Sequence, residues 1–180
     1  DRDGRPDLVV ASDQGTDGRI QFLRGGAQGF LAPFPYVVSP PARAVAAADF
    51  DLDGTPDVVA ALGDLGSGEI RIFDGDGAGG FAPGISRPAG NGTSAVAVGD
   101  FDGNGAPDVV AVSENDGGVH AFLGNGQGGL GPGTLVASGL GTPRGVVAAD
   151  LTGDGLADVA VTAATGNAVA VFRSNGDGTF

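Results

Sequence analysis

The chain has 180 residues, and 36 glycines and 11 prolines accompany a 41% share of hydrophobic residues. The glycines follow no Gly-X-Y period, which excludes collagen, and the many apolar residues argue against a disordered chain. The formal net charge is −13, and the nine basic residues are all scattered arginines. Nucleic acid and anionic membranes are therefore poor partners, because both need a basic surface. Short apolar strands joined by many turns fit this composition.

Three further features of the composition restrict the kinds of functional site that the chain can form. The chain contains no cysteine, so disulfides and thiolate metal sites are excluded. No run of about 20 apolar residues occurs, and we expect no membrane-spanning segment. The acidic residues are 20 Asp and only 2 Glu. The short Asp side chain is favoured where a carboxylate must fold back into a tight loop, as at a calcium site.

Four segments of the chain align with one another. They begin at residues 1, 49, 100 and 150 and read DRDGRPDLVVA, DFDLDGTPDVVAA, DFDGNGAPDVVAV and DLTGDGLADVAVT. Their shared glycine recurs after 50, 51 and 50 residues, at Gly4, Gly54, Gly105 and Gly155. A glycine-rich turn with the same period follows each segment and ends at residue 30, 81, 130 or 180. Two independent markers with one period indicate a tandem repeat.

Four strands can be read in chain order in the unit at residues 42–88. An Ala- and Val-rich run at residues 43–50 precedes the acidic segment, and a second apolar run follows it at residues 57–62. The alternating sequence EIRIF at residues 69–73 leads through a glycine-rich turn into a fourth run at residues 81–86. Short apolar runs separated by turn residues are typical of all-β proteins. Four strands in about 50 residues is the size of one propeller blade.

We therefore predict an all-β fold of about four repeats of ~50 residues, each forming a β-propeller blade of four antiparallel strands. The blades of this single repeat domain are expected at residues 1–40, 41–90, 91–140 and 141–180. The first blade lacks its inner strand and the last its outer strand, so we expect a partial propeller or a fragment of a larger one. Bulky third-strand residues are predicted to fill the space between blades, namely Leu23, Phe73, Phe122 and Phe172.

The acidic loop between the first and second strands of each repeat follows the pattern D-x-D-x-D-G-x-x-D. Positions 1, 3 and 5 place oxygen atoms inside a tight loop, and Gly at position 6 allows the sharp turn. The backbone carbonyl at position 7 and the carboxylate at position 9 complete an oxygen cage for a hard cation, so we expect three to four Ca²⁺ ions. The predicted metal ligands are Asp1, Asp3, Arg5 (carbonyl) and Asp7; Asp49, Asp51, Asp53, Thr55 (carbonyl) and Asp57; Asp100, Asp102, Asn104, Ala106 (carbonyl) and Asp108; Asp150, Thr152, Asp154, Leu156 (carbonyl) and Asp158.

Two alternatives bear on this interpretation of the loops. An EF-hand needs Glu at position 12, where this chain has Ala60, Ala111 or Val161, so an EF-hand is excluded. The loops could instead be ordinary Asx turns, although such turns do not need four acids in a fixed frame. Asn104 and Thr152 each replace a carboxylate, and we expect the third and fourth sites to be weaker than the second.

The acidic loop between a small-residue strand and a P-D-V-V strand, with a G-x-G-x-F turn downstream, resembles the FG-GAP and VCBS repeats. The resemblance covers essentially the whole chain. These repeats build the propeller of integrin α subunits, some fungal and bacterial lectins and many bacterial surface proteins, and the resemblance implies calcium in this hairpin. Besides Asn104 and Thr152, the chain departs from the family in keeping Phe-Gly and Gly-Ala-Pro only in part, at residues 81–83.

The resulting functional hypothesis is a non-enzymatic, calcium-binding propeller scaffold for adhesion, assembly or protein interaction. We expect it outside the cell, at the cell surface or in the periplasm, with a protein partner or self-assembly through the turns at residues 13–18 and 63–68. No nucleophile paired with a base is evident. A carbohydrate-binding lectin is an alternative, although the chain has no Trp and one Tyr to stack on sugars. An accessory domain of a secreted enzyme is a third possibility.

Overall fold

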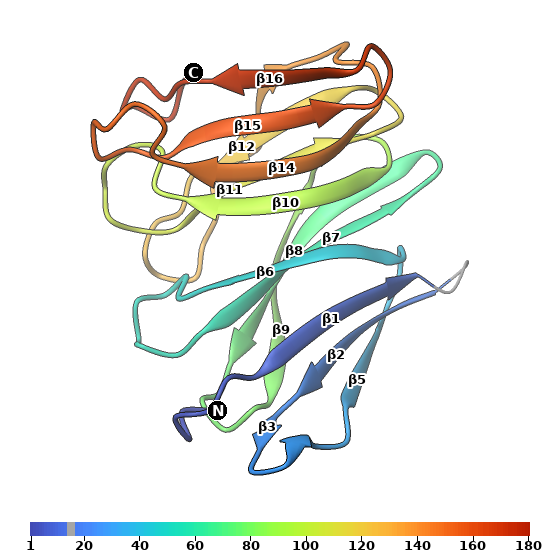
Figure 1. Cartoon of the computed structure of the whole chain (residues 1–180), viewed down its shortest axis with the longest axis vertical. Helices are drawn as coiled ribbons and strands as arrows, with labels where there is room; N and C mark the ends of the chain where they lie inside the picture. Colours follow the sequence, from blue (N-terminus) through green and yellow to red (C-terminus); the bar gives the residue numbers. More distant parts are fainter. Residues whose placement is uncertain (14–16) are drawn as a thin grey trace.

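The computed structural model describes residues 1–13 and 17–180, and all regular structure in this part of the chain is β-strand. Antiparallel strands form four successive sheets, shown in chain order from β1 to β16 in Figure 1. The first sheet contains β1 (Leu8–Asp13), β2 (Gly18–Leu23) and β5 (Phe34–Val38); the second contains β6 (Ala42–Ala48), β7 (Asp57–Asp64), β8 (Ser67–Gly75) and β9 (Phe81–Pro88); the third contains β10 (Thr93–Gly99), β11 (Asp108–Ser113), β12 (Gly118–Phe122) and β13 (Thr134–Ala137); and the fourth contains β14 (Pro143–Ala149), β15 (Asp158–Ala163) and β16 (Ala168–Phe172). A short hairpin of β3 (Gly25–Gly26) and β4 (Gly29–Phe30) follows β2.

The predicted all-β architecture of blade-like, four-stranded antiparallel sheets is confirmed. The second and third sheets have four strands each, and the first and fourth have three in the described residues. Within the second sheet, the four strands lie where the apolar runs of the sequence predict them. Period-two alternation and turn residues act locally, which is why the strand positions can be read from the sequence.

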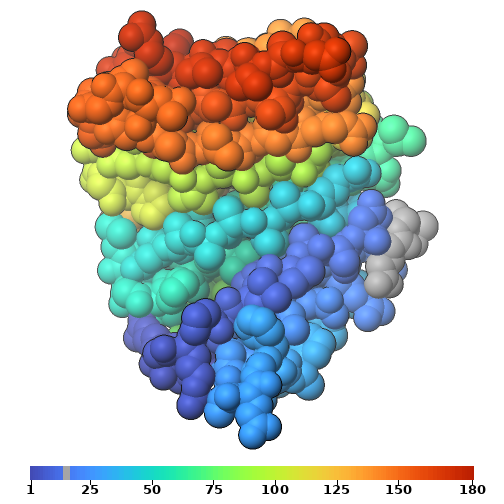
Figure 2. Space-filling model, viewed as in Figure 1, coloured from blue at the N-terminus to red at the C-terminus, as the bar shows by residue number. Residues whose placement is uncertain are grey.

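The sheets stack on one another in the order of the chain, and Figure 2 shows this succession along the long axis of the molecule. The first strands of the later sheets, β6, β10 and β14, lie side by side, and β1 packs against β6. These strands are rich in Ala and Val, with sequences such as ARAVAAA in β6. Small side chains allow the sheets to approach one another closely at this position.

The second strand of a middle sheet is buried on both of its faces. In β7, Val58, Ala60 and Leu62 join a core cluster with the first sheet, whereas Val59 and Ala61 join a cluster with the third sheet. In β11, alternate residues likewise contact the second and the fourth sheet. A strand that is buried on both faces reads as a continuous apolar run, which explains the sequences DVVAALGD and DVVAVS.

The bulky third-strand residues pack toward the preceding sheet. Phe73 is buried in the cluster between the first and second sheets, and Phe122 in the cluster between the second and third. Phe172 packs against the cluster of the third and fourth sheets. Leu23 occupies the same register position but is only half-buried. Its neighbour Phe22 points toward the second sheet, where its ring lies 5.2 Å from that of Phe81, so Leu23 faces away from the second sheet.

The outward face of the fourth sheet is apolar and exposed, with Val147, Val169 and Val171 on it. Val169 is 66% exposed, whereas Val119, at the same register position of the third sheet, is 0% exposed. The described part of the chain contains no helix with the length and apolar character that crossing a membrane requires.

Val119 and Val169 are equivalent residues of consecutive sheets, one buried and one exposed. They therefore test whether packing between sheets determines the stability of the fold. We expect Val119→Ala to lower the free energy of unfolding by about 2 kcal/mol, because it removes buried methyl groups and leaves a cavity between two sheets. Val169→Ala should change it by less than about 0.5 kcal/mol. Urea denaturation followed by circular dichroism measures both values, and equal losses would contradict the packing described above.

Candidate metal-binding loops

The second, third and fourth acidic loops lead into the second strand of their sheets, and the first loop leads into the first strand of its sheet. The first loop (residues 1–7) precedes β1, and the second (residues 49–57) joins β6 to β7. The third (residues 100–108) joins β10 to β11, and the fourth (residues 150–158) joins β14 to β15. Figure 1 shows the second, third and fourth loops on the left-hand side of the molecule. One edge of the stack therefore carries the acidic segments of successive sheets.

Each loop turns sharply at its sixth position. Gly54, Gly105 and Gly155 have φ values of 84°, 78° and 90°, a left-handed conformation that residues with a side chain rarely adopt. The amide of this glycine donates a hydrogen bond to the carboxylate at position 1, with distances of 2.7, 2.9 and 2.9 Å in the second, third and fourth loops. The backbone is thus wrapped around the first carboxylate.

The carboxylate at position 9 is buried and ties two segments together. Both oxygens of Asp57 accept backbone hydrogen bonds, from Phe50 at 2.9 Å and from Gly75 at 2.8 Å. Asp108 does the same with Phe101 and Gly124, both at 2.7 Å. In the fourth loop, Asp158 accepts from Leu151 at 3.0 Å and Ser174 at 2.9 Å. Each carboxylate oxygen keeps a lone pair with which it can bind a cation.

The structure brings three carboxylates together in the second and third loops. Ligand atoms of Asp49, Asp51 and Asp57 all lie within 4.8 Å of one another, and those of Asp100, Asp102 and Asp108 do the same. We call these groups the second and third acidic triads. Three carboxylates so close together repel one another unless a proton or a cation is present. An all-oxygen set of this kind suits a hard divalent cation such as Ca²⁺.

The predicted ligands at positions 5 and 7 lie outside the triads. Asp53 and Asn104 each accept a hydrogen bond from the amide two residues later, at 2.6 Å in both loops, and so form Asx turns. At position 7, Thr55 and Ala106 are buried, Leu156 is half-buried and Arg5 is exposed.

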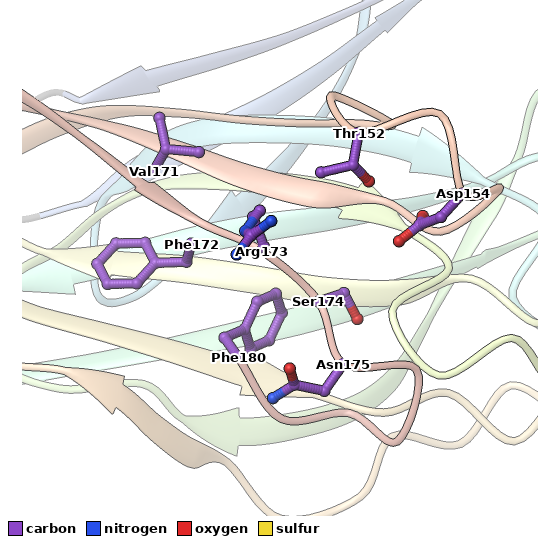
Figure 3. Close-up of a pocket in the computed structure, with 8 residues that line it drawn as sticks. All are labelled: Thr152, Asp154, Val171, Phe172, Arg173, Ser174, Asn175 and Phe180. Atoms are coloured by element: carbon purple, nitrogen blue, oxygen red, sulfur yellow. The ribbon is translucent and has the colours of Figure 1, made fainter.

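Among the described residues, the carboxylates of the first and fourth loops form no such triad. In the first loop, Asp1 and Asp7 are half-buried, and Asp3 is exposed and forms an ion pair with Arg5 at 3.1 Å. In the fourth loop, Asp150 and Asp154 are exposed, and position 3 is occupied by Thr152. Thr152 and Asp154 line a cavity of about 500 Å³ that also contains Arg173 (Figure 3). The second loop also has an arginine beside it, since Arg2 forms an ion pair with Asp53 at 3.8 Å.

Burial changes the acidity of the position-9 carboxylates. Burial raises the pKa of Asp108 to about 6, assisted by the charges of Asp102 and Asp100 and opposed by two backbone hydrogen bonds. Burial also raises the pKa of Asp57. In contrast, the backbone amides of Gly155 and Gly153 hold the pKa of exposed Asp150 below its usual value. Asp57 and Asp108 therefore gain most from a nearby cation, because burial makes their ionised forms less stable.

Sequence reasoning missed two sets of residues that build this site. One set consists of the amides that hold position 9 from beyond the third strand, from Gly75, Gly124 and Ser174. The other is the apolar residue at position 2 of each loop, Phe50, Phe101 or Leu151. The sequence does contain a signal for these apolar residues, because a bulky apolar residue recurs at the same position of three acidic loops.

Comparison with known proteins gives a family and a fold. The FG-GAP-like repeat model matches residues 1–60, 49–111 and 100–161. No curated protein matches the sequence. A solved lectin from Agrocybe aegerita, described as specifically recognising non-reducing terminal N-acetylglucosamine, is similar with a TM-score of 0.57 and 23% identity. The similarity covers 97% of this chain and 50% of the lectin chain, so this chain spans about half the lectin's length.

The raised pKa of Asp108 provides a test of its role. In calcium-free protein, we expect the Asp108 carboxyl to titrate near pH 6 and that of Asp150 below 3.8, as measured by ¹³C NMR. Between 3.8 and about 6 the folded chain holds a proton on Asp108 that the unfolded chain releases, so this carboxyl's contribution to stability is lost as the pH rises through that window.

Calcium should move the Asp108 midpoint downward, because the metal binds the ionised form and competes with the proton. An unchanged midpoint in saturating calcium would identify Asp108 as a purely structural residue.

Proposed function

The chain belongs to the FG-GAP-like repeat family, and on this basis we propose that it is a calcium-binding β-propeller scaffold that binds partners outside the cell. The observation that carries the proposal is the pair of acidic triads at equivalent positions of consecutive sheets. A chance cluster of surface acids would not recur with the same hydrogen bonds donated to it by the amides at positions 6 and 2.

The donor set and the charge of the chain favour calcium. The triads offer only oxygen ligands, and the side chains of Asp53 and Asn104 in the same loops carry further oxygen atoms. Four Ca²⁺ ions would change the formal charge from −13 to about −5, since they add eight positive charges. Weak extracellular sites, with Kd on the order of 10⁻⁴–10⁻³ M, match the millimolar calcium found outside cells.

The four loops should differ in calcium affinity. The second loop has the acidic triad and Asp53, whereas the third loop has Asn104 in the place of Asp53. In the described part of the chain, the carboxylates of the first and fourth loops form no triad, and the fourth loop has Thr152 at position 3. We propose that calcium binds first in the second loop, then in the third, and in the other two only at higher concentration.

In the proposed scaffold, the turns that join the strands of each sheet would contact the partner. The turn at residues 63–68 carries Leu65, one of the most exposed apolar side chains of the described chain, beside Asp64. In the other predicted recognition turn, residues 14–16 lie outside the described residues. An exposed apolar residue beside an acidic one suits contact with a protein surface, in adhesion or in assembly.

A glycan is the second candidate ligand, and the lectin with the similar fold favours it. Tyr36 is not free to stack on a sugar. Its hydroxyl accepts a hydrogen bond from the Phe81 amide at 2.9 Å, and its ring packs against Phe81 and Phe73. A glycan array probed with calcium-loaded protein separates the two candidates. Binding to glycans that end in N-acetylglucosamine would favour the lectin, and an empty array would leave the protein-binding scaffold.

The calcium proposal predicts a metal-specific gain in stability. At a calcium concentration 100-fold above Kd, each occupied site should add about 2.7 kcal/mol, or roughly 5–10 °C in Tm for a chain of this size. Thermal melts in EGTA, Mg²⁺ and Ca²⁺ measure this gain, and metal analysis should find about two ions per chain at low calcium and up to four at millimolar calcium.

Two variants of the second sheet provide the control. Asp49→Asn keeps the shape of a triad residue and removes its charge, so it should reduce the calcium-dependent gain in Tm. Asp64→Asn removes an exposed charge at the opposite end of β7 and should leave that gain unchanged. Equal stabilisation by Mg²⁺ and Ca²⁺ would contradict the preference for calcium, and absence of bound metal would reduce the loops to Asx turns.

A further inference from the structure

The phenylalanine at position 2 of the second and third loops packs against the following sheet. Phe50 is 2% exposed and lies in the core cluster between the second and third sheets. Phe101 is 0% exposed, and its ring lies 5.4 Å from that of Phe180 in the cluster between the third and fourth sheets. Leu151 occupies this position in the fourth sheet and is 54% exposed.

Main-chain groups of the same loops also bond to the following sheet. The carbonyl of Phe50 accepts a hydrogen bond of 3.0 Å from the amide of Gly128, in the turn after β12 of the third sheet. The carbonyl of Phe101 accepts one of 2.6 Å from the hydroxyl of Ser174, which follows β16 of the fourth sheet. Phe50 and Phe101 thus each pack a ring against the next sheet and bond to it through the main-chain carbonyl.

The same peptide segment belongs to the acidic triad. The amide of Phe50 donates to the triad carboxylate of Asp57, and its neighbours on both sides, Asp49 and Asp51, are the other two triad members. The amide of Phe101 donates to Asp108 in the same way. A change in the spacing of the three carboxylates must therefore move the residue that packs into the next sheet.

We propose that Phe50 and Phe101 are positioning residues through which calcium bound in one loop stabilises the docking of the next sheet. The inference rests on the proposed function of the loops as calcium sites. Without a cation the triad carboxylates repel one another and loosen the segment between them, and with a cation they hold it in place. Because coupling is reciprocal, a well-docked next sheet also raises the calcium affinity of the loop.

The link between consecutive loops differs along the chain. The carbonyl of Asp100 in the third loop accepts a hydrogen bond of 2.9 Å from the amide of Ala157, at position 8 of the fourth loop. The third loop has Pro107 at position 8, which has no amide hydrogen to offer the second loop. Calcium in the third loop therefore favours calcium in the fourth through this bond, whereas the second loop acts on the third sheet through Phe50 and Gly128.

Amide exchange at Gly128 tests the coupling, because Gly128 lies in a different sheet from the second loop. Hydrogen exchange followed by ¹H–¹⁵N NMR should show at least about tenfold stronger protection of the Gly128 amide in calcium than in EGTA. Asp49→Asn should remove this gain. The Asn125 amide is the internal control, since it bonds within the same turn to Gly129 at 3.1 Å and should respond less.

A second pair of variants tests the position-2 residues directly. Phe50→Leu keeps an apolar side chain, so that the chain still folds, but fills the contact less completely, and it should weaken calcium binding by the second loop several-fold. Val169→Ala, at an exposed apolar position of the fourth sheet, should leave calcium binding by the second loop unchanged. Calorimetric titration with CaCl₂ measures both affinities.

The outcomes separate the two proposals. If calorimetry finds no calcium binding to the unmodified chain, the proposed function fails and this inference fails with it. If calcium binds but Gly128 protection stays the same in calcium and EGTA, the loops are calcium sites and the coupling is wrong. Equal changes of protection at Gly128 and Asn125 would mean general stabilisation of the turn, which also overturns the inference.

Discussion

No sheet of this chain can bury its apolar side chains alone, because the second strand of each middle sheet is apolar on both faces. In β7, Val59 packs toward the third sheet and Val58 toward the first, and β11 repeats this arrangement one sheet further along. Each sheet therefore depends on its neighbours, as in other repeat proteins whose stability resides in nearest-neighbour interfaces. The small residues of β6, β10 and β14 and the phenylalanines of the third strands follow from this constraint.

A buried carboxylate fixes each of the later acidic loops to its own sheet. The buried carboxylate of Asp57 would be strongly unfavourable without partners, and the backbone amides of Phe50 and Gly75 compensate for its burial. These two bonds join the connection before β7 to the end of β8, so the loop is fixed to its own sheet. Leu52 adopts a φ of 59° in the same loop, a conformation that is unfavourable for Leu by about 1 kcal/mol and is held by the surrounding bonds.

Much of the fold could be predicted because its signals are local and repeat four times. The period of the glycines located the loops, and the alternation of apolar residues located the strands. The position-6 glycine was assigned its turn correctly, and its left-handed φ shows why Gly is needed there. The gathering of three carboxylates followed from the D-x-D spacing in the second and third loops, where the structure shows the triads.

The remaining features depend on contacts between sheets, which a single repeat does not reveal. Asp53 and Asp49 look equivalent in the sequence, but only the side-chain orientation decides that Asp53 caps the Thr55 amide while Asp49 joins the triad. The burial of Phe50 depends on the third sheet, many residues further along the chain. Arg173 comes to lie beside the fourth loop only because β16 ends there.

The positions of the loops also separate metal binding from recognition. The second loop ends where β7 begins, and the exposed turn with Leu65 follows where β7 ends, so the two lie at opposite ends of an eight-residue strand. A partner that contacts this turn would not reach the triad carboxylates. Calcium would then influence binding through the stacking of the sheets, which fixes the relative positions of successive turns, and not as a bridge to the partner. The side chain of Leu65 can vary in this turn, but the backbone of the turn is held by the segment before the third sheet. The Gly66 amide donates to the Asn91 side chain at 2.8 Å, and the Ser67 carbonyl accepts from the Gly92 amide at 3.0 Å.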